Sequence, residues 1–76
     1  MNISEDTFLI NLGIHIRQMR EKRNLSQQQL ANDCDILKVQ IGRIERAEIN
    51  TTVRTLVKIA NALEIQPKDL LDLKKL

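Results

Sequence analysis

Apolar residues recur at every third or fourth position in several stretches of this 76-residue chain, a spacing that gathers them on one face of an α-helix. The first stretch runs from a capping Ser4 to about Arg23, where Asn24 can end it in a left-handed conformation. Its apolar face comprises Leu9, Leu12, Ile16 and Met19. A later stretch begins at the capping residue Thr52 and presents Leu56, Ile59, Ala60 and Leu63. Both stretches are predicted to be amphipathic helices.

The segment between these helices carries the clearest local signal. Ser26 and Gln29 have the spacing of a capping box, and Leu25 with Leu30 can form its hydrophobic staple. The inward face of this short helix is Leu30, Ala31 and Cys34. Asp35, Ile36 and Leu37 form a turn, in which Asp35 can adopt the left-handed conformation. A further helix over about 38–46 would complete the form of a helix-turn-helix with its core at 26–46, a motif in which the second helix is laid into a nucleic-acid groove.

This second helix has two different sides. At 100° per residue, one side gathers Leu37, Ile41, Ile44 and Glu45, and the other gathers Val39, Gly42, Arg43 and Arg46. Lys38 and Gln40 flank the second, exposed side. A buried side that contains the carboxylate of Glu45 needs a cation, because an unpaired buried charge is very costly.

Pro67 suits the first position of a last helix, with Leu70, Leu71 and Leu73 behind it. The prediction is therefore an all-α, compact five-helix bundle that forms a single domain over residues 1–76. A core of this size gives only a small net stability, so a partner subunit is expected to help.

Composition narrows the function. The net charge is only +2, so any binding of nucleic acid must depend on where individual charges lie. Phe8 is the single aromatic residue, which argues against binding single strands by base stacking. Cys34 and His15 are single residues of their types, so no disulfide or zinc site is expected. With no phosphate-binding loop and no catalytic grouping, we expect no enzyme, no metal and no cofactor. With no apolar run long enough to span a bilayer and no leader pattern, we expect no membrane contact and a cytoplasmic location.

Four ordered motifs resemble the phage-repressor-like (XRE-type) helix-turn-helix family over residues 9–72. They are Leu12-Gly13-x-x-Ile16-Arg17-x-Met19-Arg20, Leu25-Ser26-Gln27-x-x-Leu30-Ala31, Ile41-x-Arg43-Ile44-Glu45 and Leu56-x-x-Ile59-Ala60-x-Ala62-Leu63. The resemblance implies a lambda-repressor-like domain that binds double-stranded DNA, usually as a homodimer on a near-palindromic operator.

The resemblance also implies roles for individual residues. Arg20 and Glu45 would form an inward ion pair, and Gln27 would touch a phosphate at the groove edge. Lys38, Val39 and Arg43 match positions that reach base edges, with Gln40 as a further one. Arg43 and Lys38 suit guanine, and Val39 suits a thymine methyl group. Arg46 and the following loop match positions that hold the DNA backbone.

This sequence departs from the family pattern at four places. Leu37 stands where a Ser or Thr usually caps the recognition helix, and Ala47 replaces the usual glycine after it. Glu48 stands where a Lys is common, so loop contacts with phosphate would rely on Arg46, Asn50 and backbone amides. Thr51 replaces a proline that is common before the next helix.

The expected function is a sequence-specific transcriptional regulator, repressor-like, that reads the major groove as a homodimer. The alternative is a helical protein-interaction module, such as a toxin-neutralising antitoxin or a coactivator-type component, favoured by Ile10, Ile14, Ile49 and the leucine-rich C-terminus. The predicted dimer surface comprises Ile49, Leu70, Leu73 and Leu76, although these residues could equally close the core.

Overall fold

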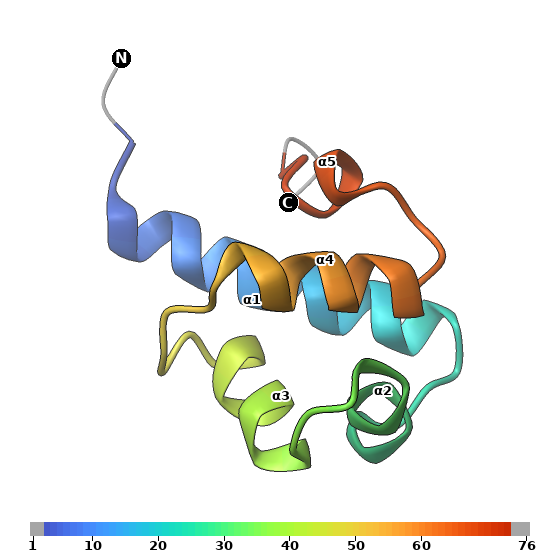
Figure 1. The fold of residues 1–76 in the computed structure, drawn as a ribbon. Helices are drawn as coiled ribbons and strands as arrows, with labels where there is room; N and C mark the ends of the chain where they lie inside the picture. Colours follow the sequence, from blue (N-terminus) through green and yellow to red (C-terminus); the bar gives the residue numbers. More distant parts are fainter. Residues whose placement is uncertain (1–2, 74–76) are drawn as a thin grey trace.

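The computed structural model describes residues 3–73 and contains five helices in that range. They are α1 (Glu5–Lys22), α2 (Gln27–Cys34), α3 (Lys38–Glu45), α4 (Val53–Ala62) and α5 (Pro67–Leu70). The long α1 and α4 lie across the middle of the view in Figure 1, with α2 and α3 below them and α5 above. α2 packs against α3 and α4, and α1 packs against α3 and α5. The predicted all-α five-helix fold is confirmed.

The predicted helix starts are present. The Ser26 Oγ accepts from the N–H of Gln29 at 3.0 Å, and the Gln29 side chain accepts from the N–H of Ser26 at 2.8 Å, which completes the capping box. Ser4 caps α1 through the N–H of Thr7, and Thr52 caps α4 in the same way. These short polar side chains satisfy backbone donors that no helical carbonyl can reach.

Four helix ends use a left-handed residue other than glycine. The φ angles are 59° at Asn24, 57° at Asp35, 58° at Ala47 and 58° at Glu64. Asn24 and Asp35 adopt the conformation expected of them. Ala47 and Glu64 lack the local polar compensation that favours Asn and Asp there, so each costs free energy in this conformation.

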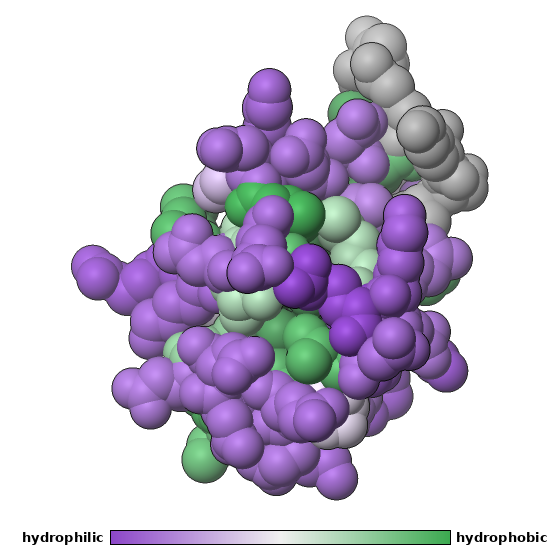
Figure 2. Space-filling model, turned by 90° about the vertical axis from the view of Figure 1, so that its right-hand side faces the viewer, coloured by the Kyte–Doolittle hydropathy of each residue, from purple (hydrophilic) through white to green (hydrophobic). Residues whose placement is uncertain are grey.

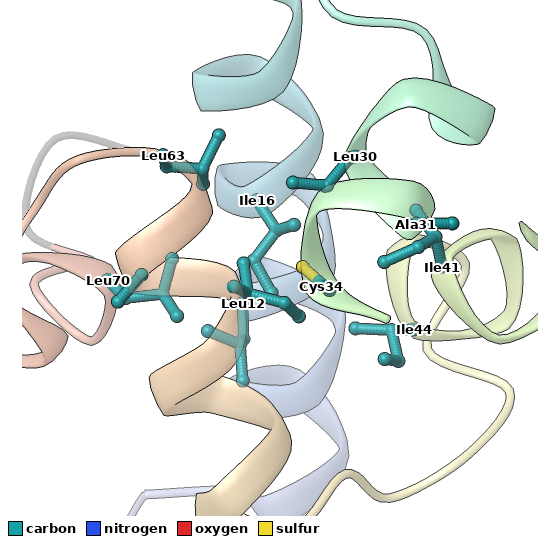
Figure 3. Packing of buried hydrophobic residues seen from close by; sticks show 11 residues of the cluster. Leu12, Ile16, Leu30, Ala31, Cys34, Ile41, Ile44, Leu63 and Leu70 are labelled. Atoms are coloured by element: carbon teal, nitrogen blue, oxygen red, sulfur yellow. The ribbon is translucent and has the colours of Figure 1, made fainter. Parts of the chain in front are cut away.

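The core draws a fully buried side chain from every helix. The largest are Ile16, Leu30, Ile41, Ile59, Leu63 and Leu70. Figure 3 shows residues of this cluster pointing toward one another between the helices. Leu70 is 0% exposed, so its assignment to the dimer surface is wrong and the alternative that it closes the core holds. Leu73 and Ile49 are partly buried against the same core, and Leu76 lies outside the described residues.

Two assignments on α3 were also wrong. Leu37 is 67% exposed, because as an extended N-cap residue it precedes the helix and does not follow the helical rotation. Gly42 is buried, although it was placed on the open side, because the Arg46 side chain covers it. A Cβ at Gly42 would lie 2.9 Å from the Arg46 Nη1.

The end of α3 is fixed closely to α1. A Cβ at Gly13 would lie 2.5 Å from the backbone oxygen of Glu45 and 2.6 Å from that of Ile44. Both distances are too short for any side chain, so only glycine allows α1 to approach the end of α3 this closely. In the described part of the chain, no helix is long and apolar enough to cross a membrane.

Candidate nucleic-acid interface

The outer side of α3 presents side chains that are open to solvent. Lys38, Gln40 and Arg43 are exposed, and Val39 is half exposed. Within residues 3–73, neither Lys38 nor Arg43 takes part in an ion pair. Two cations without carboxylate partners therefore flank a short apolar side chain on one helix face, which suits contact with a polyanion.

A buried ion pair anchors the opposite side of the same helix. The Arg20 Nε donates to the Glu45 Oε2 at 2.7 Å, and its Nη2 donates to the Oε1 at 3.1 Å. The Arg20 side chain is 10% exposed and that of Glu45 is 2% exposed. The hydrogen bond with Glu45 raises the pKa of Arg20 above its already high usual value. This bidentate contact joins α1 to the end of α3, as the resemblance implied, and orients the exposed face.

Gln27 completes this buried network rather than standing free at the surface. Its Nε2 donates to the Glu45 Oε1 at 3.0 Å, and the Gln27 side chain is partly buried. A third Arg20 nitrogen donates to the Leu25 carbonyl at 2.7 Å. Among the described residues, no buried side-chain polar atom lacks a partner. Part of the Gln27 amide, expected from the sequence to touch a phosphate, is therefore committed inward to Glu45.

A shallow hollow nevertheless opens at this junction of α1, α2 and α3. Its lining residues are Arg17, Arg20, Gln27, Glu45 and Arg46. Arg17 was not singled out from the sequence, although it is an exposed cation three positions before Arg20, almost one helical turn away. It pairs with Glu21 at 3.5 Å, a distance that leaves it available to a stronger anion.

Arg46 is engaged by a neighbouring carboxylate in the free protein. Its Nε donates to the Glu48 Oε2 at 2.7 Å, and its Nη2 donates to the Oε1 at 3.3 Å. This hydrogen bonding lowers the pKa of Glu48 and raises that of Arg46. Two oxygens on one fork of donors is also the geometry of an arginine–phosphate contact, so Glu48 occupies the group that would hold the DNA backbone.

Asn50 lies away from this hollow. It is exposed and borders a different depression beside the start of α1, lined by Ile3, Glu5, Asp6, Phe8 and Leu9. Two carboxylates there make it a less favourable place for phosphate than the Arg17–Arg46 hollow. The structure therefore does not bring Asn50 together with Gln27 and Arg46.

His15 and Cys34, the single histidine and the single cysteine of the chain, both contribute to packing between helices or to the core. The His15 Nε2 lies 3.0 Å from the Asp69 carbonyl oxygen and joins α1 to α5. Cys34 is buried, and burial raises the pKa of its thiol, which disfavours the nucleophilic thiolate. Residues 3–73 contain no group of three or more His, Cys, Asp or Glu side chains placed to hold a metal ion.

A second hollow lies where α1 ends and α4 turns toward α5, and the sequence did not indicate it. Its lining residues are His15, Gln18, Met19, Lys22, Arg23, Leu63, Glu64 and Ile65. Figure 2 looks onto this side of the molecule and shows apolar surface framed by polar side chains. One pair on its rim, Arg23 with Glu64, is already neutralised by an ion pair. Lys22 is then the one lysine or arginine of this lining that takes part in no ion pair within residues 3–73, whereas α3 presents two such cations, Lys38 and Arg43.

Comparison with known proteins identifies the architecture. The helix-turn-helix family HTH_3 matches residues 16–70. The control protein C.BamHI from Bacillus amyloliquefaciens is 46% identical over 61 residues, which cover 79% of this chain and 75% of the relative. The crystal structure of the restriction-modification controller protein C.AhdI from Aeromonas hydrophila has a TM-score of 0.83 and 31% identity, and the match covers 84% of this chain and 97% of that one.

The biofilm master regulator SinR, solved in complex with DNA, is also similar, with a TM-score of 0.76, 29% identity and coverage of 80% of this chain and 98% of that one. The family match spans more than half of the chain and includes the whole helix-turn-helix, α2 and α3. The chain belongs to the helix-turn-helix family HTH_3, a family of DNA-binding transcriptional regulators rather than of enzymes.

Proposed function

We propose that this regulator binds double-stranded DNA in a sequence-specific manner by placing the exposed face of α3 in the major groove. The observation that carries the proposal is the contrast between the two sides of α3. One side is held by the buried pair of Arg20 and Glu45, and the other offers Lys38 and Arg43 without carboxylate partners. A rigidly anchored helix with uncommitted donors is suited to reading base edges.

Each exposed residue has a chemical role in this proposal. Arg43 donates two hydrogen bonds to guanine O6 and N7, Lys38 donates to a guanine, and Val39 packs against a thymine methyl group. Arg46 leaves Glu48 and binds a phosphate of the DNA backbone. Gln27 and Arg17, which line the hollow beside α3, face the same DNA strand. Asn50, in the loop after α3, contributes less to phosphate binding because it lies away from this hollow. A regulator of this kind works where the DNA is, so the cytoplasm is its proposed compartment.

The protein is further proposed to act as a homodimer on a near-palindromic operator, because one small domain reads only a short half-site. Since Leu70 is buried, the apolar surface available for a second copy is different from that expected. Val53 is 75% exposed and Val57 37% exposed, and they lie one turn apart on α4, shortly after Ile49 in the connection from α3. A contact there lies close to α3 along the chain, which favours two recognition helices on one side of the dimer.

A charge placed in this surface tests the dimer. We expect Val53→Glu to shift the protein toward the monomer in size-exclusion chromatography with light scattering, and to weaken operator binding. Ile10→Glu is the matched control, because Ile10 is 51% exposed on α1 and lies outside the proposed contact. If Ile10→Glu dissociates the dimer and Val53→Glu does not, the contact lies on α1 instead.

The similarity to control proteins leads us to propose that this chain regulates a restriction–modification system. Support comes from 46% identity to C.BamHI over most of both chains and from the close structural match to C.AhdI. This proposal is tested by selecting an operator in vitro and locating it in the genome. An operator selected in vitro should occur next to the chain's own reading frame, near genes for a nuclease and a DNA methyltransferase.

Selection from a random duplex pool, followed by titration of the selected operator, tests DNA reading itself. Arg43→Ala should weaken operator binding by about 1–3 kcal/mol and relax preference at one base pair. Arg46→Ala should weaken binding to all duplexes alike and reduce the slope of log affinity against log salt by about 1. If both variants bind the operator as well as the parent protein, α3 is not the reading helix.

A further inference from the structure

Helix α3 begins without the side-chain cap that starts α1, α2 and α4. Its N-cap residue, Leu37, is extended, with φ −79° and ψ 144°, and a leucine side chain has no acceptor to offer. The backbone N–H of Leu37 instead donates to the Oε1 of Gln40, three residues later, at 3.2 Å. Only half of a capping box is therefore present at this helix start.

Compared with α2, the first turn of α3 depends on Gln40 alone for its side-chain hydrogen bond. In α2 the Ser26 hydroxyl and the Gln29 amide each satisfy one backbone donor. In α3 no hydroxyl is present, so the Gln40 amide is the single side chain that supports the first turn. Releasing Gln40 from this contact would leave the first turn of α3 without any side-chain cap.

The same contact fixes which end of the amide faces outward. A backbone N–H can donate only to the oxygen of a glutamine amide, so the identity of the two amide atoms is settled by this bond. The Oε1 is turned back toward the start of α3, and the Nε2 remains as the free end. Gln40 is exposed, and within the described residues its Nε2 has no hydrogen-bond partner.

We propose that Gln40 is a specificity residue of this interface that reads its base as a hydrogen-bond donor only. This inference rests on the proposed placement of α3 in the major groove. A glutamine whose amide is free can bind adenine through N6 and N7 together and so separates adenine from guanine. The Oε1 still has a second lone pair, but because it is turned back toward the helix start, the two ends of the amide do not face one base together. Gln40 then presents the Nε2 to the groove, and N7 of either purine can accept from it. Cytosine presents a donor at that edge and is rejected.

The substitution Gln40→Glu separates the capping role from the reading role. A glutamate at this position still accepts from the N–H of Leu37 and favours the positive end of the helix dipole, but it carries no donor. We expect the thermal midpoint to be maintained and the selected operator to change at one base pair in each half-site. At that position the preference for a purine over cytosine should fall by about tenfold or reverse, since a carboxylate accepts from cytosine N4.

Two further variants act as controls. Gln40→Ala removes both roles, so the thermal midpoint should fall by about 4–8 °C and the same base pair should become neutral. Leu37→Ser supplies the missing hydroxyl and completes the box without displacing Gln40. It should raise the thermal midpoint by a similar amount and leave the selected operator unchanged.

All preferences are measured as ratios between two bases at one position, because the negative charge of a glutamate weakens binding to every duplex. If Gln40→Glu leaves every base preference intact, Gln40 only caps the helix and the inference is wrong. It is equally wrong if the parent protein separates adenine from guanine by tenfold or more at the position that Gln40→Ala relaxes. A parent protein that selects no motif at all would overturn the proposed function together with this inference.

Discussion

Removal of Arg20 is the most direct test of how the reading helix is held. The Arg20 guanidinium donates three hydrogen bonds, two to the Glu45 carboxylate and one to the Leu25 carbonyl. The Glu45 side chain is only 2% exposed, so water solvates its carboxylate poorly and does not match the bidentate contact with Arg20. In Arg20→Met the apolar stem of the side chain is kept, but the carboxylate is left buried with the Gln27 amide as its remaining side-chain partner.

The expected cost is large relative to the stability of the domain. Breaking a buried pair by removing one partner typically costs about 3–5 kcal/mol, because the remaining charge is uncompensated. A domain of this length is held by roughly 4–11 kcal/mol in total, and a small core favours the lower end. We therefore expect Arg20→Met to lower the thermal midpoint by at least about 12 °C and to weaken operator binding through loss of folded protein.

The assay is urea unfolding followed by far-ultraviolet circular dichroism, with a double-mutant cycle. Glu45→Leu added to Arg20→Met removes the stranded charge and should recover more than about 2 kcal/mol of the loss. Arg17→Met is the matched control, because its pair with Glu21 is exposed and should contribute less than about 0.5 kcal/mol. If Arg20→Met costs less than about 1 kcal/mol, or if the second substitution only adds to the loss, the buried pair does not hold α3 in the way proposed.

Three smaller perturbations test other features of the structure. Ala47 has a φ of 58°, so Ala47→Gly should raise the free energy of unfolding by about 0.5–1 kcal/mol. Ala62→Gly, at the last residue of α4 where φ is not positive, should lower it instead. Chemical denaturation measures both, and equal effects of the two changes would contradict the left-handed strain.

Glu48→Gln releases Arg46 and should raise affinity for all duplexes by about threefold to tenfold in a low-salt anisotropy titration, with an unchanged binding motif. Since Arg46 lowers the pKa of Glu48, the stabilising pair is present above the usual carboxyl pKa and is lost as the pH falls through the lowered value. Any stability difference between the parent protein and Glu48→Gln should therefore disappear in strong acid. Cys34 should react with a thiol reagent far more slowly than free cysteine until urea unfolds the chain, and fast labelling of the native protein would contradict its burial.

The sequence alone determined the helices and most of the core, because those depend on neighbours a few residues away. The three- and four-residue apolar spacing places Ile16, Leu30 and Ile59 inside the bundle, where each is fully buried. Ser26 with Gln29 and the left-handed Asp35 are equally local, since the atoms that bond lie within one turn of the chain. The four ordered motifs also indicate the family without any geometry.

Tertiary structure decided which of several possible partners each polar side chain takes. Gln27 has amide groups suited to a phosphate, but the approach of α2 to α3 brings it to Glu45, 18 positions away. Leu70 looked suitable for a dimer contact until the packing of α5 against α1 and α4 buried it fully. Periodicity gives the face of a helix but not the neighbouring element that covers that face, because that choice depends on contacts between residues distant in sequence. The readable face of α3 was therefore visible in the sequence, whereas the atoms free to read were fixed only by the fold.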